Sequence, residues 1–221
     1  MLPFLLFLVR YAYVTQFLTL LTKNLLKVLV MPNIYVIGGA NGSGKTTTAK
    51  RVLPNSLEVI EYVNADEIAA GISMFNPESV AILAGRLMLE RLEILANSGV
   101  NFAFETTLAA RYFASFLRKF KLKGYNINLI FFWLQSPELA IERVRRRVES
   151  GGHNIPEDVI RRRYTRGVKN LFKLYMPLCD NWVIYDNSKG NSQVVAGCEL
   201  EQKPIIYQPK IWNQIRGIIN E

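Results

Sequence analysis

Residues 33–50 read NIYVIGGANGSGKTTTAK, and this stretch decides the fold class. Its first seven residues form an apolar run that ends in two glycines, which predicts a strand. We expect a helix to begin near Gly44. Between the two lies Gly39-x-x-x-x-Gly44-Lys45-Thr46, the pattern of a phosphate-binding loop (P-loop), in the strand-to-helix context that such a loop requires.

The residue types in this loop suit a nucleoside triphosphate with Mg²⁺. Glycines let backbone N–H groups turn toward an anion, and the N-terminus of the following helix adds partial positive charge. Lys45 offers a full positive charge to the β- and γ-phosphates, and the hydroxyl of Thr46 is the expected Mg²⁺ ligand. The predicted nucleotide-binding residues are Gly39, Ala40, Asn41, Gly42, Ser43, Gly44, Lys45, Thr46 and Thr47.

The rest of the chain alternates apolar β-branched runs with helical patterns. This alternation favours a parallel sheet with helices on both faces, the three-layer α/β sandwich of P-loop NTPases. A tail over residues 192–221 suits a hairpin and a short helix. Beyond the first strand, the expected strands are residues 57–63, 100–107, 126–134 and 181–188, and the clearest helices begin at Asn76-Pro77, near residue 111, at Ser136-Pro137 and near residue 156.

Length and composition predict a single folded domain over residues 31–221. The chain has 221 residues, half of them hydrophobic and a fifth charged, which excludes a disordered protein. Its two cysteines lie in no metal-binding or redox spacing, so a reducing compartment and a cytoplasmic location are expected.

Residues 1–30 form a strongly apolar segment that we interpret as a leader or appendage before a functional start at Met31. A secretory signal would place its positive charges first, and this segment does not. Arg10, near the middle of a candidate membrane helix, would cost about 2.5–3.5 kcal/mol on insertion. Membrane association through this segment is the alternative, and we expect no membrane contact through any other part of the chain.

The formal charge of +9 is concentrated in a short part of the chain. Residues 143–169 hold nine basic and three acidic side chains, and the first thirty residues hold three basic ones, so the remaining residues sum to zero. A charge confined in this way suits a local anion clamp better than a broad nucleic-acid-binding face. We therefore expect no nucleic-acid partner.

A P-loop alone does not separate kinases, GTPases and motor ATPases, but its surroundings favour a kinase. The base-reading NKxD element of GTPases is absent, and the strand over residues 126–134 ends in Gln135 rather than the paired acids of motor ATPases. Two arginine-rich helices joined by a Gly-Gly turn follow it, which is the layout of a lid over about residues 143–169 in a small-molecule kinase.

Helical spacing sorts the lid arginines. Arg143 and Arg147 share one face of the first helix with Arg146. On the second helix, Arg163 flanks an apolar stripe, whereas Arg162 and Arg166 point away from it. Arg143, Arg147 and Arg163, then Arg162, are the candidates for phosphate contact. A solvated basic face is the alternative for any single arginine.

Acidic residues at two strand ends are candidates for the acceptor side. Asp66 in VNADEIA follows the second strand, where a carboxylate can orient an acceptor hydroxyl and take its proton; stabilisation of a helix N-terminus is the alternative. Glu105 ends an apolar strand at the edge of the sheet where such folds bind ligands. With Thr106 and Arg111 it is predicted to bind substrate or metal-bound water.

The motifs GGANGSGKTT, VNADEIA, FAFETTLAAR, GGHNIPEDVIRRRY and WVIYDNS together resemble the zeta-toxin family of P-loop kinases over nearly all of residues 33–188. The resemblance implies a fold like that of nucleoside-monophosphate kinases, ATP as phosphoryl donor, and a UDP-N-acetyl-amino sugar as acceptor at its 3′-hydroxyl, as in a UDP-N-acetylglucosamine kinase. It implies Asp66 as the base, Glu105 and its neighbours at the acceptor, Arg147 and Arg163 as lid arginines, and Asn187 and Ser188 near the adenine. A separate antitoxin protein is an implied partner.

Two other functions remain open from the residues alone. One is a kinase for a different hydroxyl acceptor, such as a sugar acid or a nucleoside. The other is a nucleic-acid-binding or membrane-associated protein whose P-loop is regulatory, which predicts binding that weakens steeply with salt.

Overall fold

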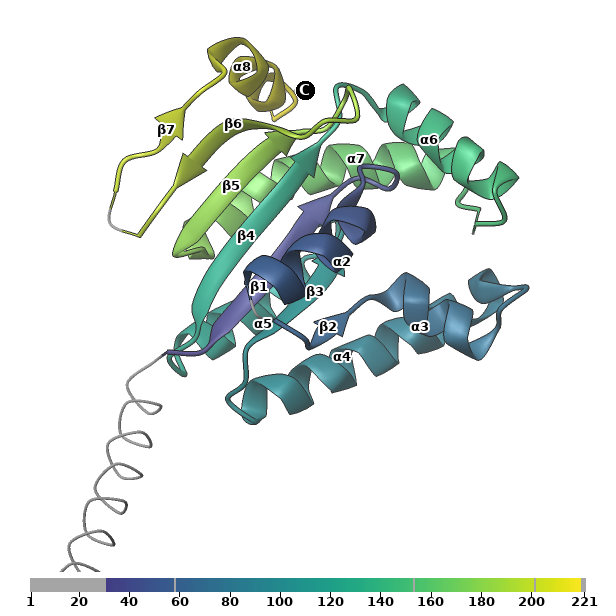
Figure 1. The fold of residues 1–221 in the computed structure, drawn as a ribbon, viewed down its shortest axis with the longest axis horizontal. Coiled ribbons are helices and arrows are strands. Elements are labelled where there is room, and N and C mark those ends of the chain that lie inside the picture. Colours follow the sequence, from purple (N-terminus) through teal and green to yellow (C-terminus); the bar gives the residue numbers. More distant parts are fainter. Residues whose placement is uncertain (1–30, 58, 153, 201, 220–221) are drawn as a thin grey trace, which may run out of the picture. The chain divides into compact units, whose positions relative to one another are not determined.

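The apolar runs predicted as parallel strands form the parallel part of one mixed sheet (Figure 1). The computed structural model describes residues 31–57, 59–152, 154–200 and 202–219. Asn33–Glu221 cluster into one unit, separate from Met1–Pro32. The interpretation of residues 1–30 as a leader and of His153 as part of the lid turn lies outside the described residues.

Among the described residues, seven strands pair in the order β2-β3-β1-β4-β5-β6-β7. The first five in this order are parallel, and β6 and β7 are antiparallel to their neighbours. The strands are β1 (Asn33–Gly39), β2 (Tyr62–Val63), β3 (Phe102–Thr106), β4 (Asn126–Trp133), β5 (Asn181–Asp186), β6 (Gln193–Cys198) and β7 (Ile205–Ile206).

Helices cover both faces of the sheet, which confirms the predicted three-layer α/β fold. Figure 1 shows α2 in front of the strands and α7 behind them. The helices are α2 (Lys45–Ser56), α3 (Ala65–Ile72), α4 (Ala81–Asn97), α5 (Tyr112–Lys121), α6 (Pro137–Glu149), α7 (Glu157–Asn170) and α8 (Pro209–Gly217), with short turns η1 (Pro77–Val80), η2 (Leu171–Tyr175) and η3 (Met176–Leu178).

Alternate side chains of β1 build two separate cores, because successive residues of a strand point to opposite faces. Ile34 and Val36 are fully buried in the larger core, together with side chains of α4, α5 and α7. Ile37 faces the smaller core, where it packs with Ala49 and Leu53 of α2. The sheet therefore fixes the start of α2 relative to the start of α7.

The tail completes the larger core as a hairpin and a short helix, as predicted. Trp212 of α8 stacks on Trp182 of β5, with ring centroids 6.0 Å apart and planes 6° apart. The apolar stripe predicted on α7 is also confirmed, since Ile160, Tyr164 and Val168 are buried. That stripe fastens α7 to the core, while Arg161, Arg162 and Arg166 of the same helix are exposed.

One predicted strand is much shorter than expected. The run over residues 57–63 pairs with β3 only at Tyr62 and Val63. Val59 instead donates its backbone N–H to the carbonyl of Leu53, which folds this stretch back on the end of α2. The predicted helix at Asn76-Pro77 begins as a 3-10 turn before α4.

Within the described ranges, no helix is by itself long and apolar enough to cross a membrane. One bent pair, Ala65–Ile72 with Pro77–Asn97 at 111°, passes that test when its two parts are taken together.

Candidate active site

The P-loop connects β1 to α2 at the carboxyl edge of the sheet, and glycines are required there. Gly39 has φ 143°, and a Cβ on it would lie 2.4 Å from the carbonyl oxygen of Phe132. Gly44 caps α2 in the left-handed region, with φ 86°. These positions let the loop turn closely over β4 and leave the first N–H groups of α2 available to an anion.

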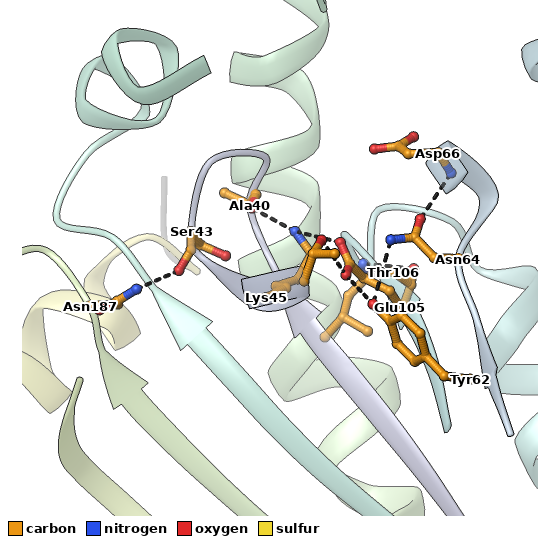
Figure 2. Close-up of polar contacts among 11 residues, drawn as sticks. Ala40, Ser43, Lys45, Tyr62, Asn64, Asp66, Glu105, Thr106 and Asn187 are labelled. Atoms are coloured by element: carbon orange, nitrogen blue, oxygen red, sulfur yellow. Dashed lines mark hydrogen bonds and ion pairs between the residues drawn. The ribbon is translucent and has the colours of Figure 1, made fainter. Parts of the chain in front are cut away.

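Side chains from other elements hold the loop in place. Asn187, after β5, donates from Nδ2 to the carbonyl of Ser43 at 2.7 Å (Figure 2). Arg143 of α6 donates from Nη2 to the carbonyls of Asn187 at 2.8 Å and Ser188 at 2.9 Å. The loop is therefore preorganised by residues more than a hundred positions away.

Lys45 and Glu105 meet at the centre of the site, as Figure 2 shows. Lys45 is 5% exposed; its Nζ donates to the carbonyl of Ala40 at 2.8 Å and lies 3.6 Å from Glu105 Oε1. The other carboxylate oxygen of Glu105 accepts hydrogen bonds from Thr46 Oγ1 at 2.8 Å and Tyr62 Oη at 2.5 Å. The register of β1 with β3 sets Ile37 beside Glu105, which brings this carboxylate to the P-loop.

Burial shifts the pKa values of Lys45 and Tyr62 in this cluster. Burial lowers the pKa of Lys45, opposed chiefly by the negative charges of Glu105 and Asp66. Burial also raises the pKa of Tyr62, and the adjacent Glu105 carboxylate raises it further. Tyr62 is therefore a neutral donor at physiological pH, and it helps to orient Glu105.

Asp66 lies in the first turn of α3, on the side of the P-loop. Asn64 caps this helix by accepting the backbone N–H of Asp66 at 2.9 Å. The Asp66 carboxylate is exposed and makes no hydrogen bond or ion pair in the described part of the chain (Figure 2). Capping of α3 by Asn64 leaves this carboxylate available for a ligand.

Two cavities meet at these residues. A cavity of about 290 Å³ lies over the P-loop and α2, with Thr46, Thr47, Arg143 and Arg147 in its walls. A cavity of about 590 Å³ lies between α3, α4, α5 and α7. Both are lined by Asn41, Lys45, Asp66 and Glu105. The cavity over the P-loop and the larger cavity therefore share one boundary.

The predicted arginines divide between the two cavities. Arg143 and Arg147 line the smaller one, as their common helical face predicted. Arg162 and Arg163 line the larger one. Arg166 also lines it, although it was not among the candidates because helical spacing placed it away from the apolar stripe of α7. Thr106 also lines the larger cavity, and its Oγ1 accepts the backbone N–H of Leu108 at 3.1 Å.

Arg111 lines neither cavity, and neither do Gly39, Ala40 and Ser43 among the predicted site residues. Arg111 is exposed at the start of α5, while its neighbours Tyr112 and Phe113 line the larger cavity. Sequence reasoning missed Tyr62, Arg86 and Arg166. A signal for Tyr62 existed, because it directly precedes the VNADE motif at the end of an apolar run.

The oxygen donors over the P-loop fit Mg²⁺. The Thr46 hydroxyl uses its hydrogen to donate to Glu105, which leaves its lone pairs free to bind a cation. Mg²⁺ commonly takes one or two protein oxygens and completes its shell with waters and substrate phosphates. Among the described residues of 31–219, no cluster of three or more His, Cys, Asp or Glu side chains could hold a metal ion.

The described geometry agrees with comparisons to known proteins. The family model for zeta toxin matches residues 20–194, most of the chain. An uncharacterised protein of Haemophilus influenzae is 30% identical over 126 residues, which cover 57% of this chain and 88% of that protein.

Solved structures support the same fold. A crystal structure of AvrRxo1-ORF1:AvrRxo1-ORF2 with ATP is similar with a TM-score of 0.66 at 17% identity, covering 84% of this chain. This chain spans 63% of the length of that chain. The PezAT chromosomal toxin-antitoxin system of Streptococcus pneumoniae is similar with a TM-score of 0.55 at 16% identity, covering 86% of each chain.

Proposed function

The chain belongs to the zeta toxin family, and on that basis we propose that it is an ATP-dependent kinase that phosphorylates a hydroxyl of a UDP-N-acetyl-amino sugar. The observation that supports this most strongly is the shared boundary of the two cavities. Lys45, Asp66 and Glu105 line both, so a donor over the P-loop and an acceptor in the larger cavity would react across them.

The smaller cavity is the proposed ATP site. The P-loop amides and Lys45 would bind the β- and γ-phosphates, and the AvrRxo1-ORF1:-ORF2 structure with ATP supports this choice of nucleotide. Lys45 is already desolvated and turned toward the loop carbonyl of Ala40, so it needs little rearrangement to meet a phosphate. Arg143 is held by backbone carbonyls at the same cavity.

Thr46 would hold Mg²⁺, oriented by its hydrogen bond to Glu105. When bound, the cation would neutralise charge on the phosphates. Arg147 would add positive charge at the same cavity, whereas Arg163 would act from the acceptor side. Phosphoryl transfer depends mainly on such positioning and charge neutralisation.

Asp66 is the proposed base. Its carboxylate lines the boundary between the cavities, where an acceptor hydroxyl would approach the γ-phosphate. It would accept a hydrogen bond from that hydroxyl, orient its oxygen toward phosphorus, and take the proton as the new P–O bond forms and the bond from the γ-phosphorus to the β–γ bridging oxygen breaks, which releases ADP. Glu105, Thr106 and Arg162 would bind the remainder of the acceptor.

Removal of the negative charge of Asp66 separates this role from stabilisation of the N-terminus of α3. Asp66→Asn should reduce phosphorylation of UDP-N-acetylglucosamine by about 10²–10⁴-fold with ATP affinity retained, as expected for loss of a general base. Asp158→Asn is the matched control, because Asp158 also lies in the first turn of a helix but outside both cavities. Unchanged turnover in Asp66→Asn would remove the assignment.

The acceptor is identified by mass spectrometry of candidates incubated with ATP, Mg²⁺ and the protein. A mass increase of one phosphoryl group on a UDP-N-acetyl-amino sugar supports the proposal. The same increase on a sugar acid or a nucleoside alone would favour a kinase for another hydroxyl acceptor, the second candidate that the shared cavities allow.

We also propose a separate antitoxin protein as partner. The AvrRxo1-ORF1:AvrRxo1-ORF2 complex and the PezAT toxin-antitoxin system, both similar to this chain in fold, support this proposal.

A further inference from the structure

The arginines of α6 and α7 fall into three groups. Arg143 and Arg147 line the cavity over the P-loop. Those on outer faces are neutralised by carboxylates of the same two helices. The pairs are Arg145 with Glu157, Arg146 with Glu142, and Arg161 with Glu138.

The arginines that line the larger cavity have no such partners. Arg162, Arg163 and Arg166 of α7 and Arg86 of α4 make no hydrogen bond or ion pair with the described residues. The acidic residues of that cavity are Asp66 and Glu105, and Glu105 already contacts Lys45, Thr46 and Tyr62. The cavity therefore has an excess of positive charge that an anionic ligand would neutralise.

All four of these arginines line the larger cavity but not the one over the P-loop. Arg163 is the lid arginine proposed above to act during transfer, which leaves Arg86, Arg162 and Arg166. Arg162 and Arg166 are four residues apart on α7, so they project from one face with Cβ atoms about 5–6 Å apart. Arg86 belongs to α4, a different wall of the same cavity.

We propose that Arg86, Arg162 and Arg166 form an anion subsite that binds a diphosphate group of the acceptor. Two guanidinium groups one helical turn apart, with a third from another wall, match a group that presents two adjacent charges. Guanidinium groups also form paired hydrogen bonds with phosphate oxygens. A nucleoside has no charge for this subsite, and a sugar acid has one carboxylate, so the subsite selects a nucleoside diphosphate derivative.

This inference rests on the proposed kinase function for the choice of acceptor, but the subsite is testable without turnover. The probe is inorganic pyrophosphate, titrated by calorimetry into protein saturated with a non-hydrolysable ATP analogue, so that the P-loop is already filled. Arg86→Gln and Arg166→Gln should each weaken pyrophosphate binding about tenfold or more, the effect of losing a charge-assisted contact. Equal affinity for the ATP analogue verifies that each variant is folded.

Arg161→Gln is the matched control. Arg161 is adjacent to Arg162 and has the same charge, but it pairs with Glu138 outside the cavity, so its loss should leave pyrophosphate affinity unchanged. In turnover assays, Arg86→Gln and Arg166→Gln should raise the KM for a UDP-sugar and leave the KM for ATP unchanged.

The outcomes separate the subsite from the proposed function. If no UDP-sugar is phosphorylated but pyrophosphate binding still requires Arg86 and Arg166, the subsite is retained and the proposed acceptor is wrong. If the wild-type protein does not bind pyrophosphate, or if Arg86→Gln and Arg166→Gln bind it as tightly as Arg161→Gln, the subsite is refuted even where a UDP-sugar is a substrate.

Discussion

Replacement of Glu105 by Gln should destabilise the protein by removing the carboxylate beside a buried lysine. Lys45 and Glu105 have side chains only 5% and 9% exposed, and their charged atoms are 3.6 Å apart. The Gln side chain retains an oxygen that accepts from Thr46 or Tyr62. The substitution therefore tests mainly the charge of Glu105.

The size of the effect follows from that separation. Two unit charges 3.6 Å apart attract by about 4.6 kcal/mol at an effective dielectric constant near 20. Removal of one partner of a buried pair typically costs about 3–5 kcal/mol, because the other charge stays buried. Since Lys45 also donates to the carbonyl of Ala40, we expect the low end, a loss of about 3 kcal/mol at pH 7.

The loss should shrink as the pH rises. Burial lowers the pKa of Lys45 in the folded protein and Glu105 opposes that shift, so without Glu105 the pKa falls further. A lysine with a lowered folded-state pKa costs stability while it is protonated, and this cost is recovered as the pH rises through the folded pKa toward the unfolded value. Lys45 therefore loses its proton at a lower pH in Glu105→Gln than in the wild-type protein, and the variant regains stability first.

Chemical denaturation, followed by fluorescence of the buried Trp133 and Trp182, measures both effects. The control is Glu93→Gln, which breaks the pair between Glu93 and Lys119. That pair is shorter, at 2.8 Å, but its side chains are 33% and 50% exposed, so its loss should cost less than about 1 kcal/mol. Equal stability of Glu105→Gln and wild type at pH 7, or a difference that grows with pH, would refute the reasoning.

Two further substitutions test the fixed parts of the site. Gly167→Ala should lower the free energy of unfolding by about 1–3 kcal/mol despite the better helix propensity of Ala, because the added Cβ would lie 2.3 Å from the carbonyl oxygen of Thr107. At Gly71 nothing lies within 4 Å of an added Cβ, so Gly71→Ala should stabilise the protein. Thermal unfolding of the two variants measures both effects. Arg143→Gln should weaken ATP binding about tenfold in calorimetry. It removes one positive charge of the cavity over the P-loop and two hydrogen bonds to the carbonyls of Asn187 and Ser188, and Asn187 in turn holds the loop. Arg145→Gln, on the outer face, should bind ATP normally.

The P-loop and the fold class were predictable because their signals are local. The glycine spacing around Lys45 and the alternation of apolar runs with helices depend on residues close in sequence. The common face of Arg143 and Arg147 likewise followed from helical geometry alone, and both line the cavity over the P-loop.

What escaped prediction depends on how distant elements are placed. Helical spacing put Arg166 away from the apolar stripe of α7, but it could not show that α4 stands across from that side and makes it a cavity wall. Tyr62 reaches Glu105 only because β2 pairs with β3, and the pairing is two residues long. Arg111 differs from these residues, since its motif lies beside the site while Arg111 itself is exposed and lines neither cavity.

The central claim is that donor and acceptor meet across Lys45, Glu105 and Asp66. A crystal structure of the protein with a non-hydrolysable ATP analogue and a UDP-N-acetyl-amino sugar tests it most directly. The account predicts the γ-phosphate against Lys45 and Thr46, and a sugar hydroxyl within hydrogen-bonding distance of the Asp66 carboxylate and facing that phosphate. A nucleotide bound away from the P-loop, or a sugar whose hydroxyls all lie beyond the reach of Asp66, would contradict it.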